Sequence, residues 1–378
     1  MTRIDAPWLK DDAAQQVCRM LTDARYQAWF VGGCVRNTLL GEPVADLDLT
    51  TDAHPDEVTR LAKAAGLRVI PTGYDHGTVT VLSQNNPFEV TTFRRDVATD
   101  GRRATVVYAD NMADDARRRD FTMNALYAGP DGEIADPLGG LPDLRARRVR
   151  FIEDADRRIK EDYLRILRFF RFYAWYGKPD DGPDPDSLAA CAANIEGLQS
   201  LSTERVTAEL LKLLAAADPA PATASMAATG ALAQVLPGAA AAALPVLIHV
   251  EEKAGLAPDP IRRLAVLGGH PQSALRLSRQ QATALEQIKS DLPAGALGYR
   301  FGAQRAMDAL AVRAASVGQN LDTNAAELAK FGASQTFPLT AADLMPSLSG
   351  PALGEALKQA EARWIASDFT LGKDDLIE

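Results

Sequence analysis

Gly32-Gly33-Cys34-Val35-Arg36 is the stretch that decides how this chain is interpreted, together with Asp46-Leu47-Asp48 about ten residues later. Leu47 and Leu49 alternate with the two aspartates, which is the period of a β-strand. The alternation predicts that both carboxylates lie on one face of the strand, about 7 Å apart. Two carboxylates at that separation suit a Mg²⁺ ion that carries a nucleoside triphosphate.

The residues around the two glycines predict a strand, a tight turn and a helix. Residues 29–31 are typical of a short buried strand, and residues 35–40 of the start of a helix. Gly32 and Gly33 would let backbone N–H groups approach phosphates closely, and Arg36 would add a charged donor. A Gly-Gly turn or an Asp-x-Asp strand is common by itself. Their combination is much rarer and favours a nucleotide site.

Length and composition indicate a multidomain globular protein. The chain has 378 residues, of which 47% are hydrophobic and 24% charged. No apolar run approaches the roughly 18 residues that span a bilayer, and residues 1–7 lack the layout of a signal peptide. The cysteines are too few and scattered for a disulfide framework or a zinc site. We therefore predict a cytoplasmic protein with no membrane contact.

Basic residues are concentrated in the middle of an otherwise acidic chain. The formal net charge is −9, but residues 143–178 contain eleven Lys or Arg against six Asp or Glu. Further arginines precede this segment, namely Arg94, Arg95, Arg102, Arg103, Arg117, Arg118 and Arg119. A solvated helix face explains some of this clustering, and a phosphate-binding cleft explains it better.

Strand and helix signals divide the chain into a mixed head and a helical remainder. Residues 77–82 and 88–93 are β-rich runs separated by turn residues, which predicts a hairpin. Residues 97–112 are polar and rich in arginine, with a short β-like run at residues 105–108, and we expect a mobile loop there. From about residue 155 onward the pattern is helical and is broken only by proline-containing segments.

A second group of polar residues follows the loop. Residues 118–126 read as a helix on which Asp120 and Asn124 stand four residues apart, on the same face. Such a pair can exchange hydrogen bonds with the ribose hydroxyls of a nucleotide. The plainer alternative is an aspartate that caps the helix, followed by an asparagine that faces solvent.

A third group lies on the helix predicted to begin near Ile159. Glu161 and Arg165 stand four residues apart, which most often means an ordinary salt bridge of about 0.3–0.5 kcal/mol. Asp162 beside Arg165 permits a sharper interpretation. Cytosine and adenine place an amino donor beside a ring-nitrogen acceptor, whereas uracil and guanine place a carbonyl beside an N–H. An Asp acceptor next to an Arg donor would therefore select CTP and ATP.

Together, these segments resemble the class II tRNA nucleotidyltransferases and bacterial poly(A) polymerases, of the DNA polymerase β-like superfamily. The resemblance covers roughly residues 30–214, and its segments follow the family's order: Gly32–Arg36 with Asp46 and Asp48, then 76–81, 89–94, 118–126, 136–140, 161–165 and 202–205. It implies an α+β head with a mixed sheet flanked by helices, followed by an all-α neck, body and tail. The expected boundaries are 1–145 for the catalytic head, 146–215 for the neck with its nucleotide-selecting residues, and 216–378 for the body and tail.

The resemblance also assigns residues to roles. Asp46 and Asp48 would bind the catalytic metals, and Glu89, on the neighbouring predicted strand, is the candidate third carboxylate. Arg102 and Arg103 would lie in the loop that helps to switch specificity from C to A. Nucleotide binding would fall to Gly32, Gly33, Arg36, Arg119, Asp120, Asn124, Glu161, Asp162, Arg165 and Arg168, with Arg118 also near the phosphates.

One position departs from the family pattern. Asn37 stands after Val35-Arg36 where the family usually has Asp. We expect the change to weaken a contact with Arg36 without removing a metal ligand.

The implied activity is template-independent addition of CCA to the 3′ end of tRNA, from CTP and ATP, with two Mg²⁺ ions and release of pyrophosphate. The partners are then tRNA and the two nucleotides, and no obligate protein partner is inferred. Poly(A) polymerase shares every motif, although the acidic tail at residues 374–378 favours a defined tRNA substrate. Enzymes that add only CC or only A are a second alternative.

A non-enzymatic alternative is an RNA-binding protein or chaperone on a decayed nucleotidyltransferase fold. Loss of Asp46 or Asp48 would have supported it, and both are present. A metal-dependent phosphohydrolase activity needs clustered His-Asp ligands, and none of the four histidines is followed by Asp.

Overall fold

The computed structural model describes residues 2–100, 103–345 and 347–377. Its chain divides into two compact units. The first comprises Met1–Ser202 with Ala228–Gln234, and the second comprises Thr203–Ala227 with Val235–Glu378. The division of function into head, neck and body remains a prediction.

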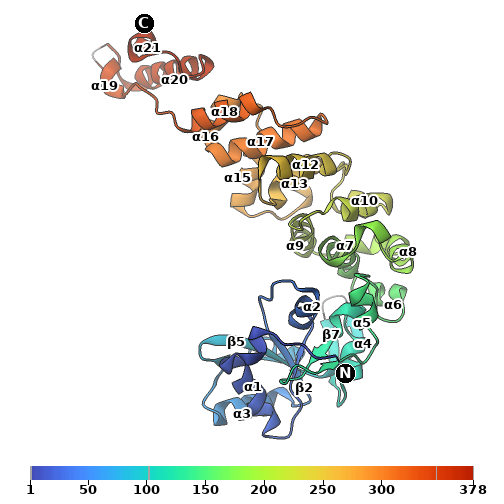
Figure 1. The fold of residues 1–378 in the computed structure, drawn as a ribbon. Coiled ribbons are helices and arrows are strands. Elements are labelled where there is room, and N and C mark those ends of the chain that lie inside the picture. Colours follow the sequence, from blue (N-terminus) through green and yellow to red (C-terminus); the bar gives the residue numbers. More distant parts are fainter. Residues whose placement is uncertain (1, 101–102, 346, 378) are drawn as a thin grey trace. The chain divides into compact units, whose positions relative to one another are not determined.

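A mixed sheet forms the centre of the first unit (Figure 1), with strand order β3-β4-β5-β2-β1-β8-β9 in the described residues. Its neighbouring strands are antiparallel except for β2 and β5, which run parallel. The strands are β1 (Trp29–Val31), β2 (Asp48–Thr51), β3 (Arg68–Ile70), β4 (Thr78–Ser83), β5 (Asn86–Thr92), β8 (Tyr127–Ala128) and β9 (Ile134–Ala135).

Two hairpins extend from residue 78 to residue 108. The predicted hairpin is confirmed as β4–β5, and its turn residues Gln84 and Asn85 both have positive φ, which suits a tight two-residue turn. The loop expected at residues 97–112 is wrong in its secondary structure. β6 (Arg94–Asp100) and β7 (Arg103–Tyr108) pair as a separate two-stranded sheet. The β-like run at residues 105–108 falls in β7, whereas the rest of the pair had been expected to be irregular.

Helices flank the sheet of the first unit. α1 and α3 lie side by side and both pack against β4 and β5 (Figure 1). The helices are α1 (Asp12–Thr22), α2 (Gly33–Leu40), α3 (Pro55–Ala64), α4 (Met112–Arg117), α5 (Leu141–Arg145), α6 (Ala155–Glu161), α7 (Leu164–Tyr176) and α8 (Pro185–Ala193). Short 3₁₀ turns accompany them: η1 (Pro7–Lys10), η2 (Tyr74–His76), η3 (Thr122–Asn124), η4 (Pro179–Asp181) and η5 (Ile195–Ser200).

The regular elements of the second unit are all helices in its described residues, with one isolated β-bridge between Ala239 and Gly268. Its helices are α9 (Thr203–Leu214), α10 (Ala220–Ala228), α12 (Leu244–Ala254), α13 (Pro260–Leu267), α14 (Pro271–Ala274), α15 (Arg279–Ile288), α16 (Ala294–Phe301), α17 (Ala303–Ser316), α18 (Thr323–Ala333), α19 (Ala341–Leu344), α20 (Gly350–Ala366) and α21 (Lys373–Ile377), while α11 (Ala231–Val235) falls mainly in the first unit. The predicted change from a mixed sheet to helices is confirmed.

Small residues allow the helices of the second unit to pack closely. A Cβ on Gly298 of α16 would lie 1.8 Å from the carbonyl oxygen of Ala329 in α18, and one on Gly332 would lie 2.1 Å from the carbonyl oxygen of Gly295. Only glycine fits at this crossing. The glycines therefore set the close approach of α16 and α18.

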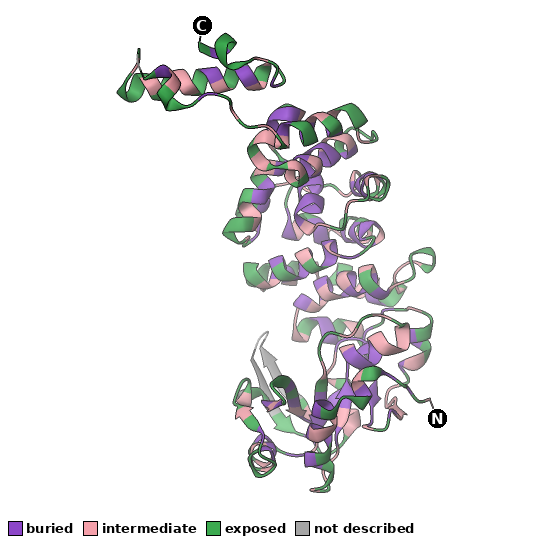
Figure 2. Cartoon of the chain, turned by 60° about the vertical axis from the view of Figure 1, so that its left-hand side comes forward, coloured by how far each residue is buried: buried purple, intermediate pink, exposed green. Residues whose placement is uncertain are grey.

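A buried ionic cluster lies at the centre of the second unit. Every residue of α13 from 261 to 267 is buried, including Arg262 and Arg263, each 1% exposed. Buried residues are purple in Figure 2. Glu251 of α12 accepts hydrogen bonds from both arginines, and Asp308 of α17 accepts one from Arg262 at 2.7 Å. We call these four residues the buried arginine cluster.

None of the helices in the described residues combines the length and apolar character of a membrane span.

Candidate active site

A left-handed glycine turn joins β1 to α2. Phe30 of β1 is fully buried, and Gly32 has φ +72° and ψ −117°, a conformation that residues with a side chain avoid. The predicted strand, turn and helix are thereby confirmed, and the first N–H groups of α2 lie at the turn. A Cβ on Gly32 would lie 3.5 Å from Nη1 of Arg119, so this guanidinium group borders the turn.

Three carboxylates gather beside Arg119. The parallel pairing of β2 and β5 sets Asp48, the first residue of β2, opposite Glu89 in the middle of β5. Burial raises the pKa of Asp48; Glu89 raises it further, Arg119 opposes the rise, and Asp46 adds to it. Because the charges of both Glu89 and Asp46 raise the pKa of Asp48, we treat these three carboxylates as one acidic group, which lies next to the cation of Arg119.

The placement of Asp46 differs from the prediction. β2 begins at Asp48, and Asp46 and Leu47 precede it. Within the described residues, β1 pairs with β2 only at Leu49 and Thr50, and β5 pairs only from Asp48 onward. The ladder therefore ends before Asp46, and strand alternation does not fix the direction of its carboxylate.

The acidic group fits a divalent cation by its chemistry. Carboxylate oxygens are the ligands that Mg²⁺ prefers, and the charges that raise the pKa of Asp48 are those a cation would neutralise. These three carboxylates influence one another electrostatically, but among the described residues no three acidic, histidine or cysteine side chains lie close enough together to hold an ion as they stand. The metal-binding roles of Asp46 and Asp48 remain predictions.

Asp115 of α4 holds the two neighbouring arginines in place. Its side chain is fully buried and accepts hydrogen bonds from Nε of Arg118 at 2.7 Å, Nη2 of Arg119 at 2.9 Å and the hydroxyl of Tyr127 at 2.9 Å. Although burial opposes it, the charges of Arg119 and Arg118 lower the pKa of Asp115 to about 2. Sequence reasoning missed Asp115, although its position three and four residues before the arginines on a helix was a usable signal.

Asp120 and Asn124 are buried together, each 7% exposed. The amide of Asn124 donates to Oδ1 of Asp120 at 2.8 Å, and Nε of Arg168 donates to Oδ2 at 2.8 Å. Burial raises the pKa of Asp120, but Arg168 and Asn124 hold it well below its ordinary value. The structure thus brings together three of the predicted nucleotide-binding residues, and their contact with ribose remains a prediction.

The helix predicted at residues 118–126 is wrong. The chain forms only the short turn η3 there, and Phe121 before it is extended, with φ −118° and ψ 149°. Phe121 makes an isolated β-bridge with Phe151, and their rings lie 4.9 Å apart. This pairing with a segment thirty residues away overrides the local helical pattern.

Arg36 is directed into the protein. It is 7% exposed, donates from Nη1 to Asn124 at 2.6 Å and from Nη2 to the hydroxyl of Tyr176 at 2.7 Å, and lies 4.1 Å from the centre of the Tyr176 ring. Its Nε and Nη2 also donate to Oδ1 of Asn37. The contact that we expected Asn37 to weaken is therefore present. Arg36 supports Asn124, and its predicted contact with nucleotide remains untested.

The helix that was predicted to carry Glu161, Asp162 and Arg165 is interrupted. α6 ends at Glu161, Asp162 is extended with φ −157° and ψ 106°, and α7 begins at Leu164. Oδ1 of Asp162 accepts the N–H of Leu164 at 3.1 Å, which helps to start the second helix. The break places Asp162 at the junction of two helices rather than within one.

Arg165 is held on one side only. Its Nη1 donates to Oε2 of Glu161 at 2.7 Å and to the carbonyl of Arg158 at 2.7 Å, and its Nη2 donates to the carbonyl of Arg118 at 3.2 Å. The predicted pair with Glu161 is present. Among the described residues, the Nε of Arg165 has no protein acceptor, so one edge of the guanidinium group is available to a ligand.

Two predicted residues remain, Arg102 and Arg103. Arg102 is outside the described residues, and Arg103 is the first residue of β7. The role in specificity predicted for both remains untested.

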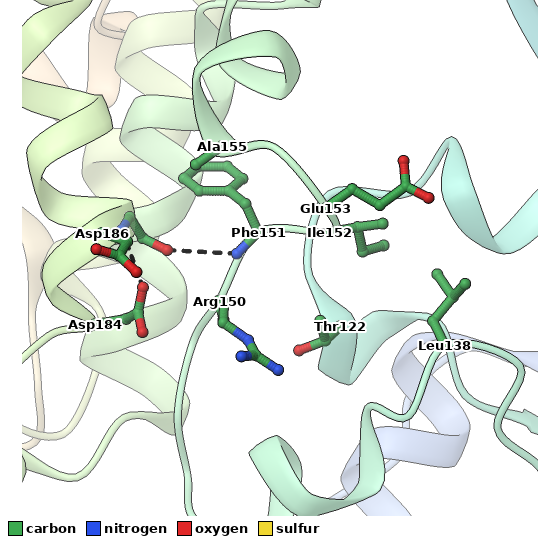
Figure 3. Close-up of a pocket in the computed structure, with 10 residues that line it drawn as sticks. Thr122, Leu138, Arg150, Phe151, Ile152, Glu153, Ala155, Asp184 and Asp186 are labelled. Carbon is green, nitrogen blue, oxygen red and sulfur yellow. Dashed lines mark hydrogen bonds between the residues drawn. The ribbon is translucent and has the colours of Figure 1, made fainter.

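A cavity of about 390 Å³ lies elsewhere in the first unit (Figure 3). Arg150 and Asp184 line it, and the N–H of Phe151 donates to the hydroxyl of Ser187 at 3.4 Å. Arg150 pairs with Asp143, and Asp184 caps α8, so both charged groups already have structural partners. None of the predicted site residues is among the described residues that line this cavity.

Two protein-family models match the chain. Residues 28–150 match the poly A polymerase head domain, and residues 183–243 match the probable RNA and SrmB-binding site of polymerase A. The first match contains the glycine turn, the three carboxylates and Asp120 with Asn124.

Named relatives match the same part of the sequence. The mitochondrial CCA tRNA nucleotidyltransferase 1 of Homo sapiens is 40% identical over 205 residues, covering 54% of this chain and 47% of the human protein. The CCA-adding enzyme of Levilactobacillus brevis is 40% identical over 205 residues, covering 54% of this chain and 50% of that enzyme. The chain spans about half the length of the curated relatives it matches.

Solved structures match over a longer part of the chain. The crystal structure of Bacillus stearothermophilus CCA-adding enzyme in complex with CTP has a TM-score of 0.75 and 29% identity, covering 96% of this chain and 94% of that one. The Thermotoga maritima CCA-adding enzyme complexed with tRNA has a TM-score of 0.71 over 99% of this chain and 95% of that one. At 18% identity, this second match shows the likeness of fold alone.

Proposed function

Since the chain carries the head domain of the poly A polymerase family and is similar to CCA-adding enzymes in sequence and fold, we propose that it adds CCA to the 3′ end of tRNA from CTP and ATP. The observation that carries this proposal is the one-sided anchoring of Arg165 beside Asp162. A guanidinium group held by protein acceptors on one edge is suited to read a base with the other.

The reaction centre is the acidic group. Nucleotidyltransferases of this kind depend on divalent metal, and we propose that Asp46 and Asp48 hold two Mg²⁺ ions, with Glu89 as the third carboxylate. Bound Mg²⁺ lowers the pKa of an attacking hydroxyl and stabilises charge on the phosphoryl and leaving groups. The carboxylates themselves would orient the 3′-hydroxyl of the RNA toward the α-phosphate.

The triphosphate would lie at the glycine turn. Gly32 lets the backbone approach closely, and the start of α2 supplies N–H donors and a positive dipole end. Arg119 borders this turn, and its Nη1 has no protein acceptor among the described residues. Asp115 and Tyr127 occupy its other two nitrogens, so the charge is fixed in direction before any phosphate binds.

Base selection would rest on Asp162 and Arg165. Asp162 accepts the exocyclic amino hydrogens of cytosine or adenine, and Arg165 donates to the neighbouring ring nitrogen. Uracil and guanine present a carbonyl to the Asp and an N–H to the Arg, so like groups would face each other without partners. Selection of two bases by one pair of side chains needs no nucleic-acid template.

The partners and location follow from the proposal. The tRNA would be the acceptor, CTP and ATP the donors, and the segment at 183–243 a candidate RNA contact, given the description of its family. A cytoplasmic location remains a prediction from composition.

The test is primer extension on three tRNAs, which end before CCA, after C and after CC. Each receives Mg²⁺ with CTP, ATP, UTP or GTP, beside an unstructured control RNA. We expect addition to stop after one CCA on tRNA and UTP and GTP to be refused. Long A-tails on the control RNA would indicate a poly(A) polymerase, and arrest after CC would indicate a CC-adding enzyme. No addition to any substrate would overturn the proposal.

A further inference from the structure

Arg158 is a buried arginine that is not among the residues proposed above for catalysis or nucleotide binding. It lies on α6 and is 6% exposed. Its Nη1 forms an ion pair with Glu161, and its Nη2 donates to the backbone carbonyls of both Arg118 and Arg119. One side chain therefore joins the end of α6 to the backbone just before Asp120.

The same acceptors also hold Arg165. Oε2 of Glu161 accepts hydrogen bonds from both Arg158 and Arg165, and the carbonyl of Arg118 does the same. The backbone carbonyl of Arg158 is a further acceptor for Nη1 of Arg165, at 2.7 Å. Arg158 thus shares two acceptors with Arg165, namely Glu161 and the carbonyl of Arg118, and its own carbonyl is the third. None of these contacts involves the Nε of Arg165.

The position of Glu161 depends on this arrangement. Its carboxylate is 17% exposed and lies between Arg158 and Arg165, whose side chains are 7% and 12% exposed. A carboxylate held by one cation can rotate about its side-chain torsions, whereas one held between two cations is fixed in direction. The direction of Glu161 in turn sets the orientation of the Arg165 guanidinium plane.

We infer that Arg158 is a positioning residue that fixes Glu161 and Arg165 in the geometry that selects bases. The inference rests on the proposed function, because it assumes that Arg165 reads the base. Arg158 contacts neither base nor phosphate in this scheme and acts only through Glu161 and the carbonyls of Arg118 and Arg119.

Arg157 supplies a matched control. It is adjacent in sequence and approaches the same carboxylate, at 3.6 Å from Oε1. Its side chain is 77% exposed, so this contact is screened by water. The two neighbouring arginines therefore carry the same charge and share a partner, but only one of them is buried against the backbone of residues 118 and 119.

The experiment compares Arg158→Gln, Arg158→Lys and Arg157→Gln with the unaltered chain. kcat/KM is measured for CTP and UTP on tRNA that ends before CCA, and for ATP and GTP on tRNA that ends after CC. We expect Arg158→Gln to lower the ratios of CTP to UTP and of ATP to GTP about tenfold, the effect of losing one charge-assisted hydrogen bond. Arg158→Lys keeps the positive charge but lacks the paired donors of the guanidinium group, so both ratios should lie between those of Arg158→Gln and the unaltered chain. Arg157→Gln should leave both ratios unchanged.

A chemical rescue separates positioning from misfolding. Arg158, Arg157, Arg118 and Glu161 line a cavity of about 260 Å³, which offers room for a small cation once the Arg158 side chain is removed. Guanidinium ion at non-denaturing concentration should therefore restore selectivity to Arg158→Ala and leave Arg157→Ala unaffected.

The outcomes of this experiment distinguish the positioning role of Arg158 from the proposed function. Equal loss of activity with all four nucleotides, at unchanged ratios and without rescue, would overturn the positioning role and leave the proposed function standing. If the unaltered chain itself fails to prefer CTP and ATP, the proposed function is wrong, whatever the variants do.

Discussion

Arginines meet carboxylates in both units of this chain, but they are held in two different ways. In the buried arginine cluster, all three guanidinium nitrogens of Arg262 and of Arg263 donate to protein oxygens. In the first unit, Arg119 and Arg165 are 17% and 12% exposed, and each keeps one nitrogen without a protein acceptor in the described residues. In the function proposed above, the saturated arginines stabilise the fold and the arginines with one open edge bind the nucleotide.

The strongest way to test the first half of this comparison is Glu251→Gln. Glu251 is 3% exposed and pairs with both Arg262 and Arg263, so the change leaves buried positive charge without its counter-ion. We expect the free energy of unfolding of the second unit to fall by about 3–5 kcal/mol. Hydrogen exchange of peptides spanning α12, α13 and α17 measures this loss locally.

Glu252→Gln is the matched control, because Glu252 is the next residue and is exposed. In Glu252→Gln, protection of the α12, α13 and α17 peptides from hydrogen exchange should match that in the unaltered chain. If Glu251→Gln exchanged no faster than this control, the cluster would not stabilise the second unit.

The opposite result is expected for Asp48→Asn in the head. Burial and the charge of Glu89 both disfavour the ionised form of Asp48. Removing the charge of Asp48 therefore relieves repulsion, and at pH values above about 4 we expect the free energy of unfolding to stay the same or to increase. Nucleotide addition should fall at least ~10²–10³-fold, as when one electrostatic partner of a reaction centre is lost. Single-turnover assays and thermal unfolding of the same preparation measure both effects.

Asp12→Asn, an exposed change on α1, is the control for Asp48→Asn. If Asp48→Asn still added nucleotides at the rate of this control, Asp48 would not be part of the reaction centre.

Acid should weaken the head before the centre of the helical unit. The folded pKa of Asp115 is about 2, against an ordinary value of 3.8, because Arg119 and Arg118 outweigh the effect of burial. Its stabilising contribution of about 2 kcal/mol is complete above the ordinary pKa and is lost as the pH falls toward the folded one. Burial raises the pKa of Asp308 despite Arg262, so protonation there does not oppose folding.

Hydrogen exchange between about pH 5 and pH 3 measures this difference, once intrinsic exchange rates are removed. Protection should fall in peptides spanning α4 and persist in those spanning α17. Simultaneous loss in both would contradict the distinction, and Asp115→Asn should abolish the pH dependence at α4.

The smallest effect on stability and nucleotide selection is expected for an exposed arginine, which is neither saturated by buried partners nor held with one edge open. Arg117 follows Asp115 on α4, is 50% exposed, and pairs with Asp114 and Glu153 at the surface. Arg117→Gln should change stability by no more than ~0.5 kcal/mol and leave nucleotide selection as it was. Chemical denaturation and the four-nucleotide assay check both expectations. A large effect would mean that exposure does not separate the classes of arginine.

Local patterns predicted the elements that the site is built on. The alternation around Leu49 and the glycines after Val31 correctly gave β2, the turn and α2, because these depend on neighbouring residues. The placement of Glu89 beside Asp48 also followed from two adjacent strand signals, and the register confirms it.

Long-range pairings account for what the sequence did not predict. Phe121 is extended because it pairs with Phe151, and no local signal announces that pairing. Asp115 looked like an ordinary surface residue in a charged run, and only the tertiary fold buries it against Tyr127. Burial of a polar side chain depends on what packs above it, which periodicity does not record.

The parallel pairing of β2 with β5 also bears on the order in which the head folds. The hairpin β4–β5 closes over a two-residue turn, so it can form early and alone, on the microsecond scale of about 1–10 μs. Asp48 meets Glu89 only after the intervening helix and strands have been placed, since forty residues separate them. Contacts so distant in sequence are slow to form. The proposed reaction centre is therefore completed late. If the chain adds nucleotides as proposed, the return of that activity during refolding would report the final assembly of the head rather than its first collapse.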